Sequence, residues 1–174
     1  VPAEDIVEET NDVPEEIIEE MKELGLFGLS IPEEYGGIGL NMEQECGIIH
    51  ELCQASLAFR SVIGTTVGIG SQGLVMTGTE EQKQQYLPRL ATGEISSSFC
   101  LTEPDAGSDA ASLRTMAIKD GDSYILNGTK RYITNALRAG MLTVMARTDP
   151  DKKGASGVSA FLVDPATPGI TIAK

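Results

Sequence analysis

Apolar residues recur at helical spacing in the first half of the chain. Residues 13–24 carry such a stripe on an otherwise acidic segment, formed by Ile17, Ile18, Met21 and Leu24. Asp12 is placed to cap the start of this helix, Glu15 to complete a capping box and Gly25 to end it. The pattern therefore predicts a helix over residues 13–24.

The same reasoning predicts two further helices and a long connection. Asn41 can cap a helix that runs through about Phe59, with an apolar side formed by Cys46, Ile49, Cys53 and Leu57. Thr79 can cap another helix, which Pro88 bends or ends. The Gly- and Pro-rich residues 25–40 predict an irregular connection with apolar anchors at Leu26, Phe27, Leu29 and Ile31.

Residues 61–78, SVIGTTVGIGSQGLVMTG, contain Gly68, Gly70 and Gly73 in the GxGxxG spacing of dinucleotide-binding turns. That motif needs a strand before it, a helix after it and an acidic residue at the end of the next strand. Here the preceding residues are small and Gly-rich, and Glu94 lies in a TGE turn. We therefore expect a closely packed helix of small residues rather than a nucleotide site.

After Gly93 the hydrophobic pattern changes to the period of two that is typical of strands. The segments with this pattern are SSSFCLT, LRTMAIK, SYILNG, KRYIT, MLTVMART and VSAFLVD. The turn signals DG, NG and GASG divide them, which favours an antiparallel meander or barrel. The predicted fold class is α+β with two domains, an all-α helical bundle over residues 1–95 and an antiparallel β-domain over residues 96–174.

Charge and composition exclude several classes of protein. The net charge is −13, and residues 1–51 hold fifteen acidic residues against one basic residue, Lys22. This surface does not suit nucleic acid, and a solvated helix face explains the acidic run. No stretch reaches the roughly 20 apolar residues of a membrane span, and the N-terminus lacks the pattern of a signal peptide. We expect a cytoplasmic protein, or one of the mitochondrial matrix.

No metal site is predicted. Cys46, Cys53 and Cys100 have no paired spacing, so we expect reduced thiols. The single histidine, His50, has no CxxC or HExxH arrangement around it, and an ordinary helix position explains it best.

Two β segments end in polar loops that could border a ligand. CLTEPDAGSD presents Thr102 and Ser108, and KRYITNA presents Tyr132, Thr134 and Asn135. A flavin needs an aromatic or apolar wall and a hydroxyl near its reactive nitrogen, while the cofactor carries the redox chemistry. Turn capping by the hydroxyls and packing of the tyrosine is the alternative that residue types alone leave open.

Longer segments resemble one family. FCLTEPDAGSD (99–109), NGTKRYITNA (127–136), LGLFGLSIPEEYGGIGL (24–40) and TEEQKQQYLPRLATGE (79–94) resemble, in the same order, the acyl-CoA dehydrogenase family of flavoproteins. The resemblance implies an N-terminal helical domain, a middle β-barrel and a C-terminal helical domain, with FAD held between the last two. Because residues 157–174 resemble strands partway through the middle domain, it also implies an incomplete barrel and a fragment of a larger enzyme.

The resemblance assigns FAD-binding roles to Phe99, Leu101, Thr102, Gly107, Ser108, Tyr132, Ile133 and Thr134. Leu101 and Thr102 would serve the flavin ring, while Gly107 and Ser108 would serve the pyrophosphate. Ser108 would also touch the acyl-CoA. Tyr132 and Ile133 would flank the ring, with the Thr134 hydroxyl near its reactive nitrogen.

The sequence departs from the family pattern at three positions. Tyr132 stands where tryptophan is common, Phe99 where tyrosine is common, and Asp105 where glycine is common. The family's catalytic base is a carboxylate of the C-terminal domain, so no catalytic residue is expected within these 174 residues. Glu103 and Asp109 are carboxylates near the loop, but structural roles in turns explain them better.

The activity implied is FAD-dependent α,β-dehydrogenation of an acyl-CoA thioester, with an electron-transfer flavoprotein as electron acceptor. A homo-oligomer is implied for the full-length form. A flavin oxidase or monooxygenase on the same scaffold is one alternative. A non-catalytic binding or assembly module is the other.

Overall fold

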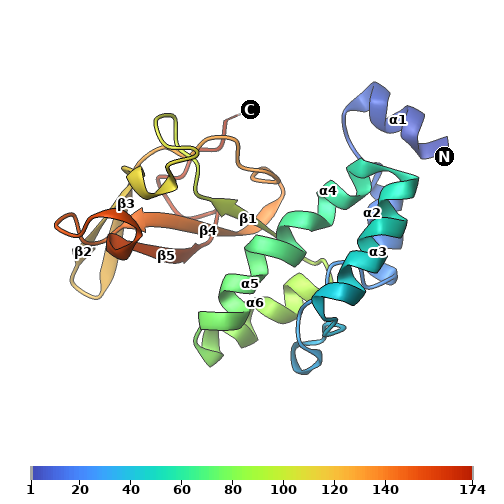
Figure 1. Ribbon diagram of the computed structural model, residues 1–174, viewed down its shortest axis with the longest axis horizontal. Coiled ribbons are helices and arrows are strands. Elements are labelled where there is room, and N and C mark those ends of the chain that lie inside the picture. Colours follow the sequence, from blue (N-terminus) through green and yellow to red (C-terminus); the bar gives the residue numbers. More distant parts are fainter. Residues whose placement is uncertain (1, 174) are drawn as a thin grey trace. The chain divides into compact units, whose positions relative to one another are not determined.

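A computed structural model describes residues 2–173, and Figure 1 shows their course. The chain divides into two compact units. Val1–Ser97, here the helical unit, contains helices, and Ser98–Lys174, here the β unit, is built on strands. The predicted α+β class is confirmed.

The helices of the first unit are α1 (Pro2–Thr10), α2 (Glu15–Glu23), α3 (Met42–Ala55), α4 (Leu57–Thr65), α5 (Ser71–Thr77) and α6 (Glu80–Ala91). A 3₁₀ turn at Glu33–Tyr35 and a π-helical turn at Thr66–Gly70 complete them. The sequence pattern did not predict α1. The segment with GxGxxG spacing runs through α4, the π-helical turn and α5, so the expectation of a helix is confirmed.

Two of the three predicted caps are confirmed. Asn41 forms a capping box with Gln44 at the start of α3, and Thr79 forms one with Gln82 at the start of α6. The cap predicted for α2 is wrong, because its N-cap position is Pro14, which has no side-chain acceptor. Asp12 instead accepts a hydrogen bond from the Val13 backbone N–H at 2.9 Å.

Three other details differ from the prediction. The helix predicted through Phe59 ends at Ala55, because Ser56 is extended and its hydroxyl accepts from the Ala58 N–H at the start of α4. Pro88 does not end α6, since the Thr92 N–H still reaches the Pro88 carbonyl at 3.2 Å. The predicted apolar side of α3 is displaced, because Cys46 is exposed.

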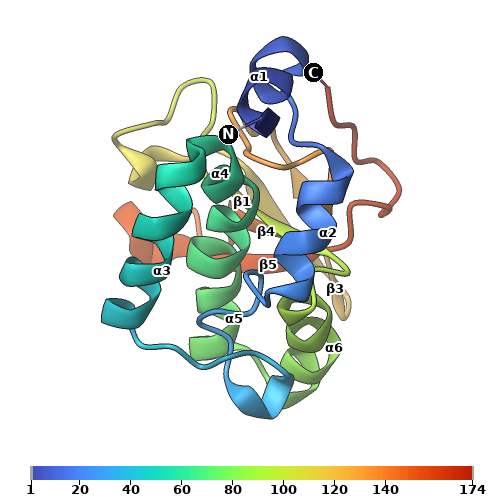
Figure 2. The same ribbon diagram turned by 90° about the vertical axis from the view of Figure 1, so that its right-hand side faces the viewer.

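The core of the helical unit lies between α2, α3, α4 and the connection of residues 24–40. Its buried members include Ile18, Met21, Phe27, Leu29, Phe59 and Ile63, and α3 adds Ile48, Ile49 and Leu52. Figure 2 shows α2, α3 and α4 gathered around it. The predicted anchors Leu26, Phe27, Leu29 and Ile31 are all buried. The connection folds tightly on itself at Gly37, where a Cβ atom would overlap the Ile31 carbonyl.

The β unit has one open, mixed sheet. Its strands are β1 (Ser96–Cys100), whose first two residues belong to the helical unit, β2 (Met116–Asp120), β3 (Ser123–Asn127), β4 (Ala139–Arg147) and β5 (Val158–Val163). The order is β1-β4-β2-β3, and β5 also pairs with β4. The hairpins β2–β3 and β4–β5 are antiparallel, but β2 meets β4 in parallel at Met116 and Arg147. A simple antiparallel meander is therefore wrong, while an incomplete barrel agrees with the open sheet.

Residues 130–134 form no strand, although their alternation predicted one. Tyr132 has φ 57° and Asn135 has φ 62°, and these left-handed residues interrupt the extended backbone that a regular strand needs. The segment is a loop that leads into β4. Among residues 2–173 no helix is long and apolar enough to cross a membrane.

We expect Leu29→Ala to lower the free energy of unfolding of the helical unit by about 2–5 kcal/mol, because the side chain is fully buried and its loss leaves a cavity. Leu24→Ala is the matched control, since Leu24 is 70% exposed and its loss should change stability by less than about 0.5 kcal/mol. Urea unfolding followed by circular dichroism measures both. Equal effects would contradict the assigned core.

Candidate functional site

The first site segment, residues 98–109, is here called the TEPD segment. It leaves β1 and turns at Glu103 and Ala106, whose backbone groups bond to each other in both directions. The Glu103 carboxylate is buried and accepts from the Arg114 N–H at 2.6 Å and the Thr115 N–H at 2.9 Å. The Thr115 hydroxyl donates to it as well. This carboxylate therefore closes the loop between β1 and β2.

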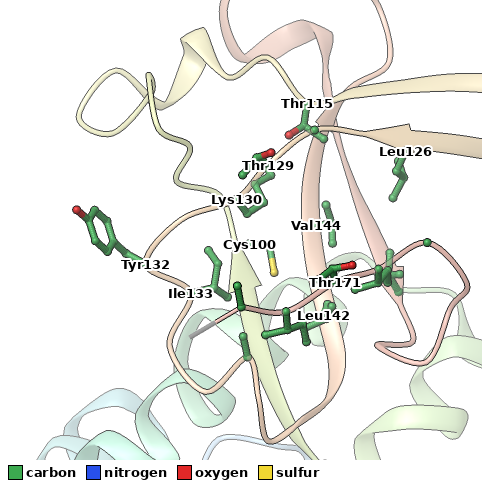
Figure 3. A pocket seen from close by; sticks show the side chains of 17 residues that line it. Cys100, Thr115, Leu126, Thr129, Lys130, Tyr132, Ile133, Leu142, Val144 and Thr171 are labelled. Carbon is green, nitrogen blue, oxygen red and sulfur yellow. The ribbon is translucent and has the colours of Figure 1, made fainter.

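The second site segment, residues 128–136, is here called the KRYI segment. Its left-handed Tyr132 is 78% exposed, and in Figure 3 the ring points away from Cys100 and Ile133. The Arg131 guanidinium lies 4.6 Å from the ring centroid, which is a cation–π distance. The segment thus presents an aromatic face to solvent from a fixed backbone.

Four polar contacts join the two segments. The Lys130 ammonium lies 2.7 Å from a Glu103 carboxylate oxygen and 3.2 Å from the Leu101 carbonyl. The Arg131 N–H donates to the Thr102 carbonyl at 2.8 Å. The Ser98 hydroxyl donates to the Thr134 carbonyl at 2.7 Å. Residues 98–103 and 130–134 therefore form one surface.

The predicted site residues fall into two groups. Phe99, Leu101, Thr102, Tyr132, Ile133 and Thr134 lie on the joined stretches, where the aromatic and hydroxyl side chains of Tyr132 and Thr134 are exposed and the others are half-buried. Gly107 and Ser108 lie farther along the TEPD segment, at its exposed tip. The structure thus brings six of the eight together, and their roles stay a prediction.

A pocket of about 460 Å³ opens beside the KRYI segment. Its walls are formed by Cys100, Leu126, Lys130, Ile133, Leu142, Val144, Val163 and residues 169–173, among others. Figure 3 shows the sheet side chains on its inner wall. Of the predicted residues only Tyr132 and Ile133 line it, so the pocket and the predicted site share an edge rather than coincide.

The charges of the site are set by Glu103 and Lys130. Burial alone raises the pKa of Glu103, but hydrogen bonds from Lys130, Thr115 and Arg114 outweigh it and lower this pKa to about 2. Burial raises the pKa of the Cys100 thiol to about 11, and the Lys130 charge opposes this rise only in part. Cys100 is therefore a neutral thiol at physiological pH.

The two carboxylates considered as bases have structural roles. Glu103 is ionised and surrounded by donors, and a base with such a low pKa binds a proton too weakly to abstract one from carbon. Asp109 accepts from the Ser112 hydroxyl in the following turn. Sequence reasoning did not find Lys130 as the partner of Glu103, because no local pattern connects residues 27 positions apart.

The exposed groups fit a flat, polar ligand such as a flavin nucleotide. Tyr132 offers an aromatic face and Thr134 a hydroxyl on the same loop. Apart from Gly107 and its two chain neighbours, no residue has an atom within 4 Å of the place where a Gly107 Cβ would stand, so this backbone is open to the approach of a phosphate. Within residues 2–173 no group of three His, Cys, Asp or Glu side chains is arranged to hold a metal ion.

Comparisons with known proteins cover nearly the whole chain. The family model of the acyl-CoA dehydrogenase N-terminal domain matches residues 1–94, and that of the acyl-CoA dehydrogenase middle domain matches residues 98–174. An acyl-CoA dehydrogenase of Bacillus subtilis is 42% identical over 173 residues, which are 99% of this chain and 45% of that protein.

Two solved structures are similar in fold. A glutaryl-CoA dehydrogenase from Mycobacterium smegmatis in complex with FADH2 has a TM-score of 0.83 at 40% identity, over 94% of this chain and 40% of that one. A prolyl acyl carrier protein oxidase has a TM-score of 0.89 at 34% identity, over 95% of this chain and 44% of that one. The chain spans less than half the length of each of these relatives.

The low pKa of Glu103 predicts a local acid sensitivity. Because this pKa falls from 4.5 to about 2 on folding, ionised Glu103 stabilises its loop above the unfolded pKa, and this contribution is lost as the pH falls from about 4.5 to about 2. We expect the Arg114 and Thr115 amides to lose hydrogen-exchange protection over this range. In Glu103→Gln that pH dependence should vanish.

Asp105→Asn is the control, because Asp105 lies in the same loop and its ion pair with Arg114 is largely exposed. This variant should keep the pH profile of the wild type. Identical profiles for the wild type and Glu103→Gln, after correction for intrinsic exchange rates, would show that the carboxylate does not hold the loop.

Proposed function

The chain belongs to the acyl-CoA dehydrogenase family, and from this premise we propose that it forms one wall of an FAD site in the whole protein. The reaction proposed is α,β-dehydrogenation of an acyl-CoA thioester. The observation that carries the proposal is the joining of the TEPD and KRYI segments, in which the Thr102 carbonyl is bonded to the residue before exposed Tyr132, and Ser98 to the carbonyl of exposed Thr134. When bound, FAD would accept a hydride from the β-carbon of the substrate.

The residues proposed to hold FAD are Phe99, Leu101, Thr102, Gly107, Ser108, Tyr132, Ile133 and Thr134. Tyr132 would stack against the ring, and its left-handed backbone supports this because it turns the side chain out of the loop. Thr134 would offer its hydroxyl to the ring. The open backbone at Gly107 and the exposed Ser108 would receive the pyrophosphate, with Ser108 also against the acyl-CoA.

We propose that the catalytic base lies in a part of the whole protein beyond these residues, because Glu103 and Asp109 are committed to turns. The whole protein would pass electrons to an electron-transfer flavoprotein and would be a homo-oligomer. A cytoplasmic or mitochondrial-matrix location would give it access to acyl-CoA. The length of the relatives, more than twice that of this chain, supports a missing catalytic part.

A flavin oxidase is the second candidate function. The similarity to a prolyl acyl carrier protein oxidase favours it, since that protein has the same fold at 34% identity. The two candidates share the first half-reaction and differ in how the reduced flavin is reoxidised. Oxygen consumption by the reduced protein therefore separates them.

We expect the full-length protein to show the visible absorbance bands of bound FAD and to bleach when acyl-CoA is added without oxygen. Slow reoxidation by oxygen and fast reoxidation by an electron-transfer flavoprotein would identify a dehydrogenase. Fast reoxidation by oxygen would identify the oxidase instead. A full-length protein that binds no FAD after reconstitution would contradict the proposed function and favour a non-catalytic module.

The role of Tyr132 is tested by Tyr132→Ala in the same protein. Loss of the stacked ring should weaken FAD binding about tenfold. Leu137→Ala is the matched control, because Leu137 is also exposed and lies just beyond the KRYI segment. Titration of the apoprotein with FAD measures both. Equal affinities of the two variants would remove Tyr132 from the site.

A further inference from the structure

The Glu103–Lys130 ion pair stands apart from the other ion pairs of the β unit. Its two side chains are only 5% and 11% exposed, whereas those of Arg114 and Asp105, in the same loop, are 78% and 68% exposed. Exposed pairs contribute little because water screens them. A buried charge that loses its partner, in contrast, is strongly unfavourable. The position of Lys130 is therefore closely tied to that of Glu103.

Each member of the pair also makes hydrogen bonds to backbone groups of another stretch of chain. Glu103 holds the backbone of Arg114 and Thr115 at the entrance to β2. Lys130 reaches the Leu101 carbonyl at 3.2 Å as well as the carboxylate. The ion pair thus joins three stretches of backbone rather than two side chains.

Gly128 adds a steric constraint to the same joint. A Cβ atom at this position would overlap the Thr115 hydroxyl, which donates to Glu103. The start of the KRYI segment therefore packs directly on the group that holds the carboxylate. Movement of Lys130 away from Glu103 would open this contact too.

The joint lies next to the residues proposed to contact the flavin. Thr102 precedes Glu103 in the chain, and Tyr132 follows Lys130 by two positions. Although Lys130 borders the pocket beside the KRYI segment, both side chains of the pair are almost fully buried, so neither is placed to touch a ligand on the exposed side. Its effect on the ligand must pass through the backbone of the two segments.

We propose, on the basis of the FAD site described above, that Glu103 and Lys130 are positioning residues that hold the two flavin-contacting segments in register. Their ion pair sets how far Thr102 lies from Tyr132 and Thr134. Breaking it leaves the segments joined only by the Arg131–Thr102 and Ser98–Thr134 hydrogen bonds, so the free site is held less closely in the shape that the ring needs. FAD affinity and the environment of the bound flavin then depend on a charge pair that the cofactor does not touch.

The test uses Lys130→Met in the full-length protein, because this variant removes the two contacts that Lys130 makes between the segments and leaves the three bonds from Arg114 and Thr115 to Glu103. Titration of the apoprotein with FAD should show affinity weakened by about tenfold or more. The absorbance band of the bound flavin should also lose its fine structure as solvent enters. Lys130→Arg keeps the charge and should restore most of the affinity.

Asp105→Asn is the matched control, since it breaks the exposed ion pair of the same loop and should leave FAD affinity within about twofold. Circular dichroism of each apoprotein checks that it folds. If Lys130→Met does not fold, the double variant Glu103→Gln with Lys130→Met carries the measurement, because it leaves no buried charge unpaired.

The outcomes distinguish this proposal from the function on which it rests. A wild-type protein that binds no FAD removes both. A wild-type protein that binds FAD, with a folded Lys130→Met of equal affinity and unchanged flavin spectrum, overturns the positioning role and leaves the proposed function standing. Weakened binding in Lys130→Met, recovered in Lys130→Arg and absent from Asp105→Asn, supports it.

Discussion

The organisation of the β unit depends on the burial of one carboxylate. A buried charge is tolerated only when donors surround it, because it has given up its water. Glu103 finds its donors in Arg114 and Thr115 on one stretch of chain and in Lys130 on another. Satisfying this one group therefore fixes the loop after β1, the entrance to β2 and the loop before β4. The exposed residues of the candidate site, Tyr132 and Thr134, lie on the last of these three stretches.

The helical unit reaches its fold by a different route, and the sequence predicted more of it. Capping by Asn41 and Thr79 is a local interaction between residues three apart, so it could be recognised in the sequence. Burial of Leu29 and Ile31 followed from their apolar character in a Gly- and Pro-rich connection. The start of α2 was predicted wrongly, because Pro14 rather than Asp12 occupies its N-cap position. The apolar stripe does not show which of these residues begins the helix.

In the β unit the sequence predicted the segments that matter but not how they meet. The family match over residues 98–174 confirms the resemblance drawn from short motifs. Strand order could not be predicted, because the contacts of β4 with β1 and β2 are between distant parts of the chain. The Glu103–Lys130 ion pair was not predicted for the same reason. Alternation in residues 130–134 predicted a strand, since it does not distinguish an extended chain from a loop with left-handed residues.

The strained conformation of Tyr132 follows from these non-local contacts. A non-glycine residue at φ 57° is unfavourable by itself and persists only when its surroundings leave the chain no alternative. The backbone on either side of Tyr132 is fixed, by the Arg131 N–H on Thr102 before it and by the Ser98 hydroxyl on the Thr134 carbonyl after it. Lys130 anchors the start of the same turn through Glu103. The buried charge and the exposed aromatic ring are thus linked, because the Lys130 contact that satisfies the carboxylate also anchors the turn from which Tyr132 projects.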